Sequence, residues 1–188
     1  MKLFEDIPIF PLKSIILPGG QFPLRIFERR YLDMTRNCLK HNTGFVIALT
    51  KKDSDYITSV YDYASYVEIV DWSQLDGGLL GITVEGKNII KLDDYKLDEG
   101  NLLIGNGKEI ETGLDYLIPQ KYQILSKFYK KIYPEIKSYI FHNKPKYNDA
   151  NWIGFRLIEC LPIQLNDKAD LISMSEPLDR LERILHII

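Results

Sequence analysis

The stretch from Pro8 to Met34, PIFPLKSIILPGGQFPLRIFERRYLDM, constrains the fold of this chain most. Its four prolines fix φ and remove backbone donors, so we expect no long interior strand through this segment. The large aliphatic side chains between the prolines must still be buried. We therefore predict short strands near a sheet edge or a barrel rim, joined by a tight turn at Pro18-Gly19-Gly20.

A helix is predicted directly after this stretch. Beyond Phe27, the residues Tyr31, Thr35 and Cys38 recur at i, i+4 and i+7, which is the spacing of one helix face. The opening unit of the chain is thus a strand, a Pro-Gly turn, a strand and a helix.

The rest of the first half has the pattern of a β structure. A continuous apolar run at 45–49 is typical of a strand buried on both faces, and Asp76-Gly77-Gly78 predicts a turn between strands. Glycines also predict a turn at 85–88, and a bulge or a turn after residue 104. Further strands are expected within 56–72, 80–84, 89–92 and 102–104. Short strands at this spacing, interrupted by one helix, favour a small antiparallel β-barrel.

Beyond Gly113, the apolar residues recur at the spacing of helix faces. The sequence predicts a break at Tyr133-Pro134 with a shorter helix after it, and helix starts near Pro119, Asp149, Asn166 and Pro177. We therefore predict an α+β fold with two parts. An antiparallel β-barrel with one inserted helix is expected over residues 1–113, and an α-helical bundle over residues 114–188.

Composition and charge bound the function class. The formal net charge of −2 argues against a dedicated binder of duplex DNA. The two cysteines, Cys38 and Cys160, lie in apolar helical patterns and are interpreted as core residues in a reducing compartment. The N-terminal segment is too polar for a signal peptide, and no apolar run approaches the ~20 residues of a membrane span. We expect a cytoplasmic protein without membrane contact.

The opening stretch also resembles a known family. The order P-L, then L-P-G, then F-P-L-x-I-F-E-x-R-Y is similar to the start of the Lon N-terminal domain, the substrate-recognition module in front of the ATP-dependent Lon proteases. The matching residues are Pro11, Leu12, Leu17, Pro18, Gly19, Pro23, Leu24, Ile26, Phe27, Glu28, Arg30 and Tyr31. The resemblance implies a PUA-like barrel, in which most of these residues have a structural role.

The second half extends the resemblance over essentially the whole chain. Segments of the family's helical bundle are matched by Arg156-Leu157, Glu159, Leu161-Pro162, Lys168, Leu171-Ile172 and Arg180-Leu181. No G-x-x-x-x-G-K-[ST] phosphate loop occurs, and no length remains for an ATPase or a Ser-Lys peptidase domain. We therefore expect a free-standing bacterial member that is not an enzyme. Neither a cofactor nor a metal is expected.

The resemblance implies that this chain binds unfolded or exposed apolar polypeptide, in conjunction with a protease in trans. The alternative is RNA binding, because the barrel resembles RNA-binding domains and residues 121–146 hold seven lysines against one glutamate. A solvated helix face explains these lysines more simply. Nucleic acid is therefore the second hypothesis, and peptidase activity ranks last.

Two aromatic residues are candidates for the binding surface. Phe22 lies in the turn region between Gly20 and Pro23, and Trp72 lies at a strand end before a polar turn. Both rings either cap the barrel core or form an exposed surface that binds unfolded chains. Glu28 and Arg30 form either a ligand contact or a buried ion pair between barrel and helix, and we favour the ion pair.

Overall fold

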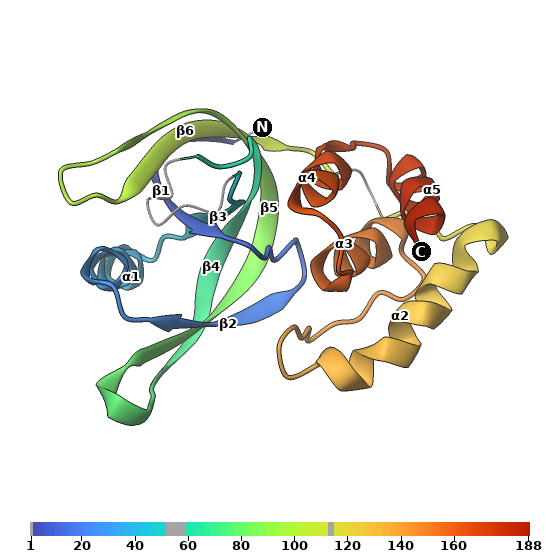
Figure 1. Cartoon of the computed structure of the whole chain (residues 1–188), viewed down its shortest axis with the longest axis horizontal. Helices are drawn as coiled ribbons and strands as arrows, with labels where there is room; N and C mark the ends of the chain where they lie inside the picture. The colour runs from blue at the N-terminus through green and yellow to red at the C-terminus, as the bar shows by residue number, and fades with distance from the viewer. Residues whose placement is uncertain (1, 52–58, 113–114) are drawn as a thin grey trace.

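The computed structural model describes residues 2–51, 59–112 and 115–188. The first part of the chain holds six strands and one α-helix, and the second part holds four α-helices (Figure 1). The strands are β1 (Leu3–Leu12), β2 (Gln21–Ile26), β3 (Phe45–Leu49), β4 (Tyr63–Gln74), β5 (Leu80–Leu97) and β6 (Leu103–Ile110). The α-helices are α1 (Arg29–His41), α2 (Gln123–Ile136), α3 (Ala150–Cys160), α4 (Leu165–Ser173) and α5 (Pro177–Ile187), with short 3₁₀ turns η1 (Asp76–Gly78) and η2 (Gln120–Tyr122).

The strands form one sheet that closes on itself. The order is β2-β5-β4-β3-β1-β6, and β5 also pairs with β6, so five strands make a barrel-like ring and β2 adds to β5 outside it. The α+β prediction is confirmed. One detail is corrected: β1 and β3 are parallel, so the sheet is mixed rather than wholly antiparallel. β2 and α1 form the connection from β1 to β3, and this long crossover lets the two strands run in the same direction.

The prediction that no long interior strand runs through the opening prolines is wrong. β1 has ten residues and lies between β3 and β6. It pairs with β6 up to Ile9 and with β3 from Ile9 onward, so Pro8 and Pro11 each have a neighbouring strand on one side only. A proline without an N–H is tolerated at such positions.

The turn predicted at 85–88 lies inside a strand, since β5 continues through Gly86. β6 also continues through Gly105 and Gly107 without a turn, but the register with β1 and β5 shifts beside these glycines, which agrees with the bulge that was predicted as the alternative. A Cβ on Gly86 would lie 2.3 Å from the Leu17 carbonyl oxygen, and a Cβ on Gly105 would lie 2.6 Å from that of Asp94. These glycines allow close backbone approach rather than chain reversal. The turn at Asp76-Gly77-Gly78 is confirmed, with positive φ at both glycines.

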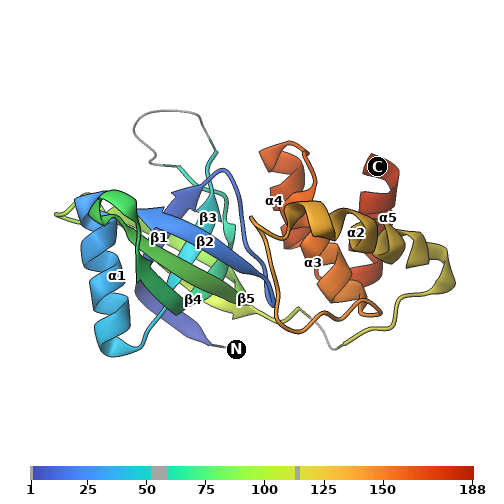
Figure 2. The ribbon, with the colours of Figure 1, turned by 90° about the horizontal axis from the view of Figure 1, so that it is seen from below.

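Helix α1 covers the end of the sheet away from the other helices (Figures 1 and 2). Its buried face consists of Tyr31, Met34, Thr35 and Cys38, as the spacing predicts. These residues pack on a core that includes Leu24, Ile26, Phe45, Ile82 and Val84. All five residues of β3 are buried, so the prediction for 45–49 is confirmed.

The four later helices pack together on the opposite side of the strands (Figure 2). Asp149 caps α3 by accepting a hydrogen bond from the Trp152 amide, and Pro177 opens α5, both as predicted. Pro134 lies inside the last turn of α2 instead of ending it. The N-cap position of α4 is held by Gln164 rather than Asn166, without a side-chain hydrogen bond. None of the described helices is long and apolar enough to cross a membrane. The predicted boundary at Gly113 lies outside the described residues, so the division into 1–113 and 114–188 stays a prediction.

Candidate functional site

A tight turn of the barrel part, Leu17 to Gly20, meets the helical part. The Gly20 amide donates to the Leu17 carbonyl over 3.0 Å, and Gly19 has φ of +83°. This is the geometry of a type II turn, which places proline first and glycine second among its central residues. The tight turn predicted at Pro18-Gly19-Gly20 is thus confirmed, although it does not join two paired strands.

A buried ion pair on α3 holds this turn. Arg156 and Glu159 lie one helical turn apart, are 2.7 Å from each other, and have fully buried side chains. The Arg156 Nη2 donates to the Leu17 and Pro18 carbonyls over 2.9 and 3.1 Å, and the Leu17 amide donates to Glu159 Oε1 over 2.6 Å. The ion pair therefore fastens the barrel to the bundle.

The site of this ion pair is fully buried and tightly packed. Burial raises the pKa of Glu159 to about 7, although the nearby Arg156 and the Leu17 amide favour its charged form. A Cβ on Gly20 would lie 2.4 Å from Arg156 Nη1, so only glycine fits beneath the guanidinium group. The sequence motif contains both charged residues, but their partners on Leu17 lie about 140 positions away and could not be read from it.

Arg180 organises the bundle itself. This buried side chain donates to the carbonyls of Leu171 and Met174 and to Asn151 Oδ1, and so links α5 to α3 and α4. Lys168, also buried, donates to the Glu159 carbonyl. Four of the second-half positions that resemble the family, Arg156, Glu159, Lys168 and Arg180, therefore make buried contacts that hold the structure together.

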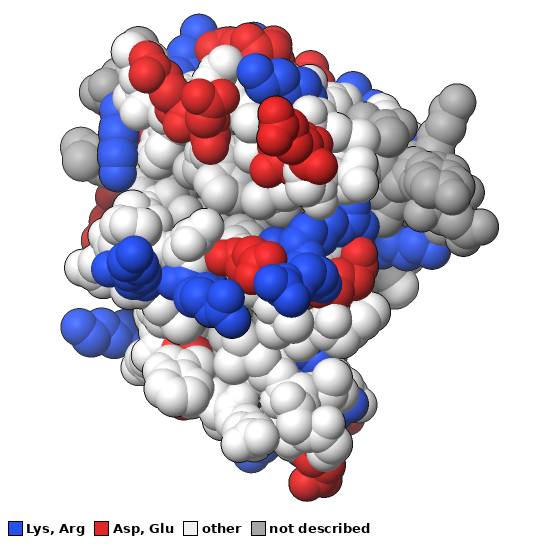
Figure 3. All heavy atoms as spheres, turned by 90° about the vertical axis from the view of Figure 1, so that its left-hand side faces the viewer, with Lys and Arg blue, Asp and Glu red and all other residues white. Residues whose placement is uncertain are grey.

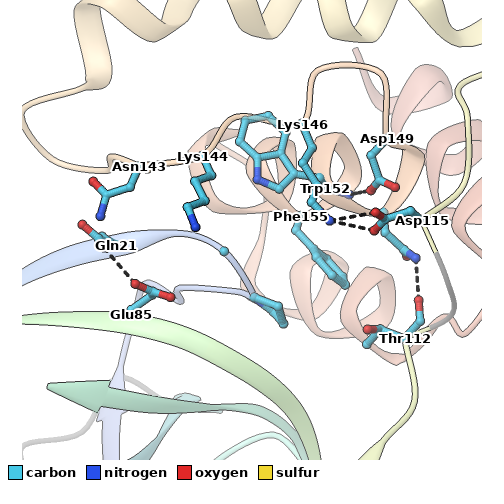
Figure 4. A pocket seen from close by; sticks show the side chains of 13 residues that line it. Gln21, Glu85, Thr112, Asp115, Asn143, Lys144, Lys146, Asp149, Trp152 and Phe155 are labelled. Carbon is cyan, nitrogen blue, oxygen red and sulfur yellow. Dashed lines mark hydrogen bonds and ion pairs between the residues drawn. The ribbon is translucent and has the colours of Figure 1, made fainter. Parts of the chain in front are cut away.

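A cleft of about 490 Å³ opens at the junction of the two parts (Figure 4). Its walls come from the Leu17–Gly20 turn, β2, β5, α3 and the loop between α2 and α3. Most of its charged groups have partners: Glu85 accepts from Gln21, and Lys146 pairs with Asp115. Lys144 and Asn143 project from the loop toward β2 (Figure 4). Ligand sites favour such junctions, and the cleft is compatible with one.

Phe22 and Trp72 lie on one face of the three-stranded ribbon β2-β5-β4. Phe22 lies opposite Val84, and Trp72 lies opposite Ile82, two positions earlier on β5. Their environments differ. Phe22 is half-buried and packs against the core under α1, whereas 62% of the Trp72 surface is exposed. Trp72 is therefore the more accessible of the two candidates.

More apolar side chains are exposed at this end of the ribbon. Phe27, which we expected to be structural, directly follows β2 and is 69% exposed, and Val70 and Leu79 of the β4–β5 hairpin are also exposed. Figure 3 shows a mostly uncharged surface over this hairpin, below a band of charged side chains over α1. We call Phe22, Phe27, Val70, Trp72 and Leu79 the hairpin surface.

The free edge of β2 offers little to an incoming strand. The amide and carbonyl of Gln21 are already paired with Phe141 of the α2–α3 loop. In an antiparallel edge strand, the backbone N–H and C=O groups of every second residue point away from the sheet. After Gln21 the next such residue is Pro23, which has no N–H to donate. Pairing of an extended chain with this edge is therefore disfavoured, and we expect side chains to make the contact instead.

The other motif residues lie in or beside the barrel. Pro11 and Tyr31 are buried, Leu12 and Pro18 are half-buried, and Pro23 is exposed. Glu28 and Arg30 do form an ion pair of 2.7 Å, but both side chains are partly exposed, so the prediction of a buried pair is wrong. Arg30 also donates to the Asn101 carbonyl over 2.8 Å, and so links α1 to the β5–β6 turn.

The three histidines lie in different parts of the structure. His41 and His186 lie in the last turns of α1 and α5, as helix-end residues. His142 instead lies within a ring cluster with Tyr133, Tyr147 and Trp152, which the sequence did not indicate. Among the described residues, no group of three or more His, Cys, Asp or Glu side chains could hold a metal ion.

Comparison with known proteins assigns the family. The model of the ATP-dependent protease La (LON) substrate-binding domain matches residues 6–188. The chain belongs to the Lon substrate-binding domain family. A crystal structure of a Lon N-terminal domain protein from Xanthomonas campestris is 26% identical, with a TM-score of 0.79, and the match covers 99% of this chain and 98% of that one.

Two curated Lon proteases are also similar. The Lon protease of Endomicrobium trichonymphae is 24% identical over 196 residues, which covers 100% of this chain and 24% of that protein. Lon protease 3 of Sorangium cellulosum is 22% identical over 195 residues, which covers 97% of this chain and 23% of that protein. This Lon-type chain thus spans about a quarter of the length of either relative. The N-terminal domain of a Mycobacterium avium complex Lon protease shares the fold, with a TM-score of 0.63 at 14% identity.

Proposed function

We propose that this Lon-type domain is a non-catalytic binding module for exposed apolar or unfolded polypeptide in the cytoplasm, and that it delivers such chains to a protease in trans. The observation that carries the proposal is the exposure of Trp72 in an uncharged surface. An exposed tryptophan offers a large contact area at a low cost in conformational entropy, which suits recognition of varied apolar side chains. Family membership agrees with a role in substrate binding.

RNA binding remains the second hypothesis, with less support. Two of the seven lysines in 121–146 are engaged in ion pairs, Lys121 with Glu182 and Lys146 with Asp115. Of the most exposed aromatic residues, Phe27 and Trp72 lie on the barrel, away from these lysines, whereas Tyr139 lies within this segment. A nucleic-acid surface needs rings and cations side by side.

Replacing Trp72 with serine tests the polypeptide hypothesis. We expect affinity for a reduced, carboxymethylated protein probe to fall about tenfold or more, because a well-placed aromatic anchor is lost. The thermal midpoint should change little, since most of this side chain is already exposed. Fluorescence anisotropy and thermal unfolding measure the two effects.

Tyr139→Ser is the matched control, because Tyr139 is 69% exposed but lies in the helical part, after α2. It should leave affinity for the probe unchanged. Phe22→Ser should lower both affinity and stability, because this ring also packs on the core. Equal affinities for wild type, Trp72→Ser and Tyr139→Ser would contradict the hairpin surface as the binding site.

A further inference from the structure

A second, preformed groove lies on the helical part. Two hollows of about 510 and 380 Å³ share Leu117, Lys130, Tyr147 and Asn148 in their walls. The walls come from the extended segment before η2, from α2 and from the loop that enters α3. We call these two hollows together the Leu117 groove.

Hydrogen bonds fix the walls of the groove. The Ser126 hydroxyl donates to the Tyr147 carbonyl over 2.6 Å, which ties α2 to the loop. The Ile118 amide donates to the Asn148 carbonyl over 2.9 Å, and the Ala150 amide donates to the Tyr116 carbonyl over 2.7 Å. A ligand would therefore meet an ordered surface and would not have to organise it.

The groove presents an apolar contact. Leu117 is the most exposed of the large apolar residues in the described chain, at 79%, and half of the neighbouring Tyr116 is exposed. Leu117 lies on the wall of both hollows, so an apolar side chain seated in either one would contact it. Burying this surface favours association.

The charges along the groove do not balance. Asp115 pairs with Lys146 (Figure 4), and the Asp149 carboxylate accepts from the backbone amides of Trp152 and Tyr116. No described carboxylate pairs with Lys127 or Lys130. The Lys130 ammonium instead lies 4.7 Å from the centre of the Tyr147 ring. Two ammonium groups are thus left to interact with a ligand.

We propose that the Leu117 groove binds an acidic polypeptide segment, in which an apolar residue packs on Leu117 while flanking carboxylates meet Lys127 and Lys130. This rests on the proposed function and adds a charge preference to it. The juxtaposition of an exposed leucine with two unpaired ammonium groups selects for carboxylates and against cations. The groove and the hairpin surface would contact different parts of one polypeptide or partner.

A polypeptide fits the groove better than a nucleic acid does. Base stacking needs an open aromatic face. Of the two rings on the groove wall, Tyr116 is half exposed, and Tyr147 is already engaged, since Lys130 lies over it and His142 and Trp152 contact it edge to face. Leu117 offers an aliphatic contact that suits a side chain.

The test compares two fluorescent peptides with the same apolar residues, one flanked by four aspartates and the other by four lysines. We expect the wild-type protein to bind the acidic peptide roughly tenfold more tightly at low salt, with a smaller preference at high salt. The double charge reversal Lys127→Glu and Lys130→Glu should abolish or invert this preference. Leu117→Ser should weaken binding of the acidic peptide without lowering the thermal midpoint, because its side chain is exposed.

The matched control is the double reversal Lys131→Glu and Lys137→Glu. These exposed lysines come from α2 and its C-terminal end but do not line either hollow, so the peptide preference should stay within about twofold of wild type. An equal loss of preference in both double variants would overturn the proposal, since only overall charge would then matter. Displacement of the acidic peptide by polyuridylate, with the same lysine dependence, would overturn it in favour of nucleic acid.

The outcomes separate this proposal from the function on which it rests. If both peptides bind equally and Trp72→Ser weakens both, the Leu117 groove is refuted while the hairpin surface stands. If neither peptide nor the unfolded-protein probe binds the wild-type protein, both proposals fail.

Discussion

Replacing Arg156 with alanine should lower the free energy of unfolding by about 3–5 kcal/mol, because it leaves the carboxylate of Glu159 buried without its partner. The same change removes the hydrogen bonds from Arg156 to the carbonyls of Leu17 and Pro18. Urea denaturation measures the loss. The barrel and the bundle are fastened at this ion pair, so the variant should also unfold with broader or separated transitions for the two parts.

The loss should depend on pH. Burial already raises the pKa of Glu159 to about 7 in the folded protein, and removal of Arg156 raises it further above the unfolded value of about 4.3. The folded variant then binds a proton that the unfolded chain releases, so its stability increases as pH falls. We expect Arg156→Ala to be less destabilising at pH 5 than at pH 8.

Arg30→Ala is the control for the buried pair. The Arg30–Glu28 pair is partly exposed to water, so its loss should cost less than about 1 kcal/mol. This replaces our sequence-based expectation that Arg30 anchors the barrel through a buried pair. Similar losses for Arg30→Ala and Arg156→Ala, with no difference between pH 5 and pH 8, would show that burial does not set the strength of these two ion pairs.

Replacing Gly86 with alanine should destabilise the protein by about 1–3 kcal/mol or more, because its backbone contacts leave no room for a methyl group. The added Cβ would lie 2.3 Å from the Leu17 carbonyl oxygen and 2.5 Å from its carbon. Gly86 also exchanges hydrogen bonds of 3.0 Å with Gly19 and Gly20, so the whole turn would have to move. Thermal or urea unfolding measures the effect.

Gly81→Ala is the matched control in the same strand. A Cβ there would lie 3.0 Å or more from the side chain of Leu75, which can move aside. The cost should be below about 1 kcal/mol, since alanine also orders a strand better than glycine does. An equal cost at both positions would mean that the turn does not depend on close approach to β5.

Several elements could be predicted from neighbouring residues in the sequence alone. The Pro-Gly turn, the buried face of α1, the run of β3 and the Asp149 cap all follow from what each residue permits in its own backbone or within one helical turn. The resemblance to the Lon N-terminal domain further implied that a barrel comes first in the chain and a helical bundle follows it. Phe22 lies inside β2 rather than in a turn and packs on the core, whereas Trp72 is 62% exposed.

The candidate sites could be predicted only in part. The sequence singled out Trp72 but did not indicate Phe27, whose motif position suggested a structural role. It located the lysines of 121–146 without showing which of them have acidic partners. Lys121 and Lys146 do, and their partners lie 61 and 31 residues away. Ion pairing at such separations depends on how helices pack, and local spacing does not report it.

Sequence by itself determined several strands, helices and tight turns of this chain, among them β3, α1 and the turn at Pro18-Gly19-Gly20, because those choices depend on φ preferences and the spacing of apolar side chains. Tertiary structure decided whether a glycine ends a strand or lets another backbone approach, as at Gly86. It also decided that β1 runs parallel to β3 and that Arg156 and Glu159 hold a turn about 140 residues away. These features depend on backbone groups that meet only when the ring of strands closes and the helices pack. Backbone groups are nearly the same in every residue, so the sequence does not indicate which of them will meet.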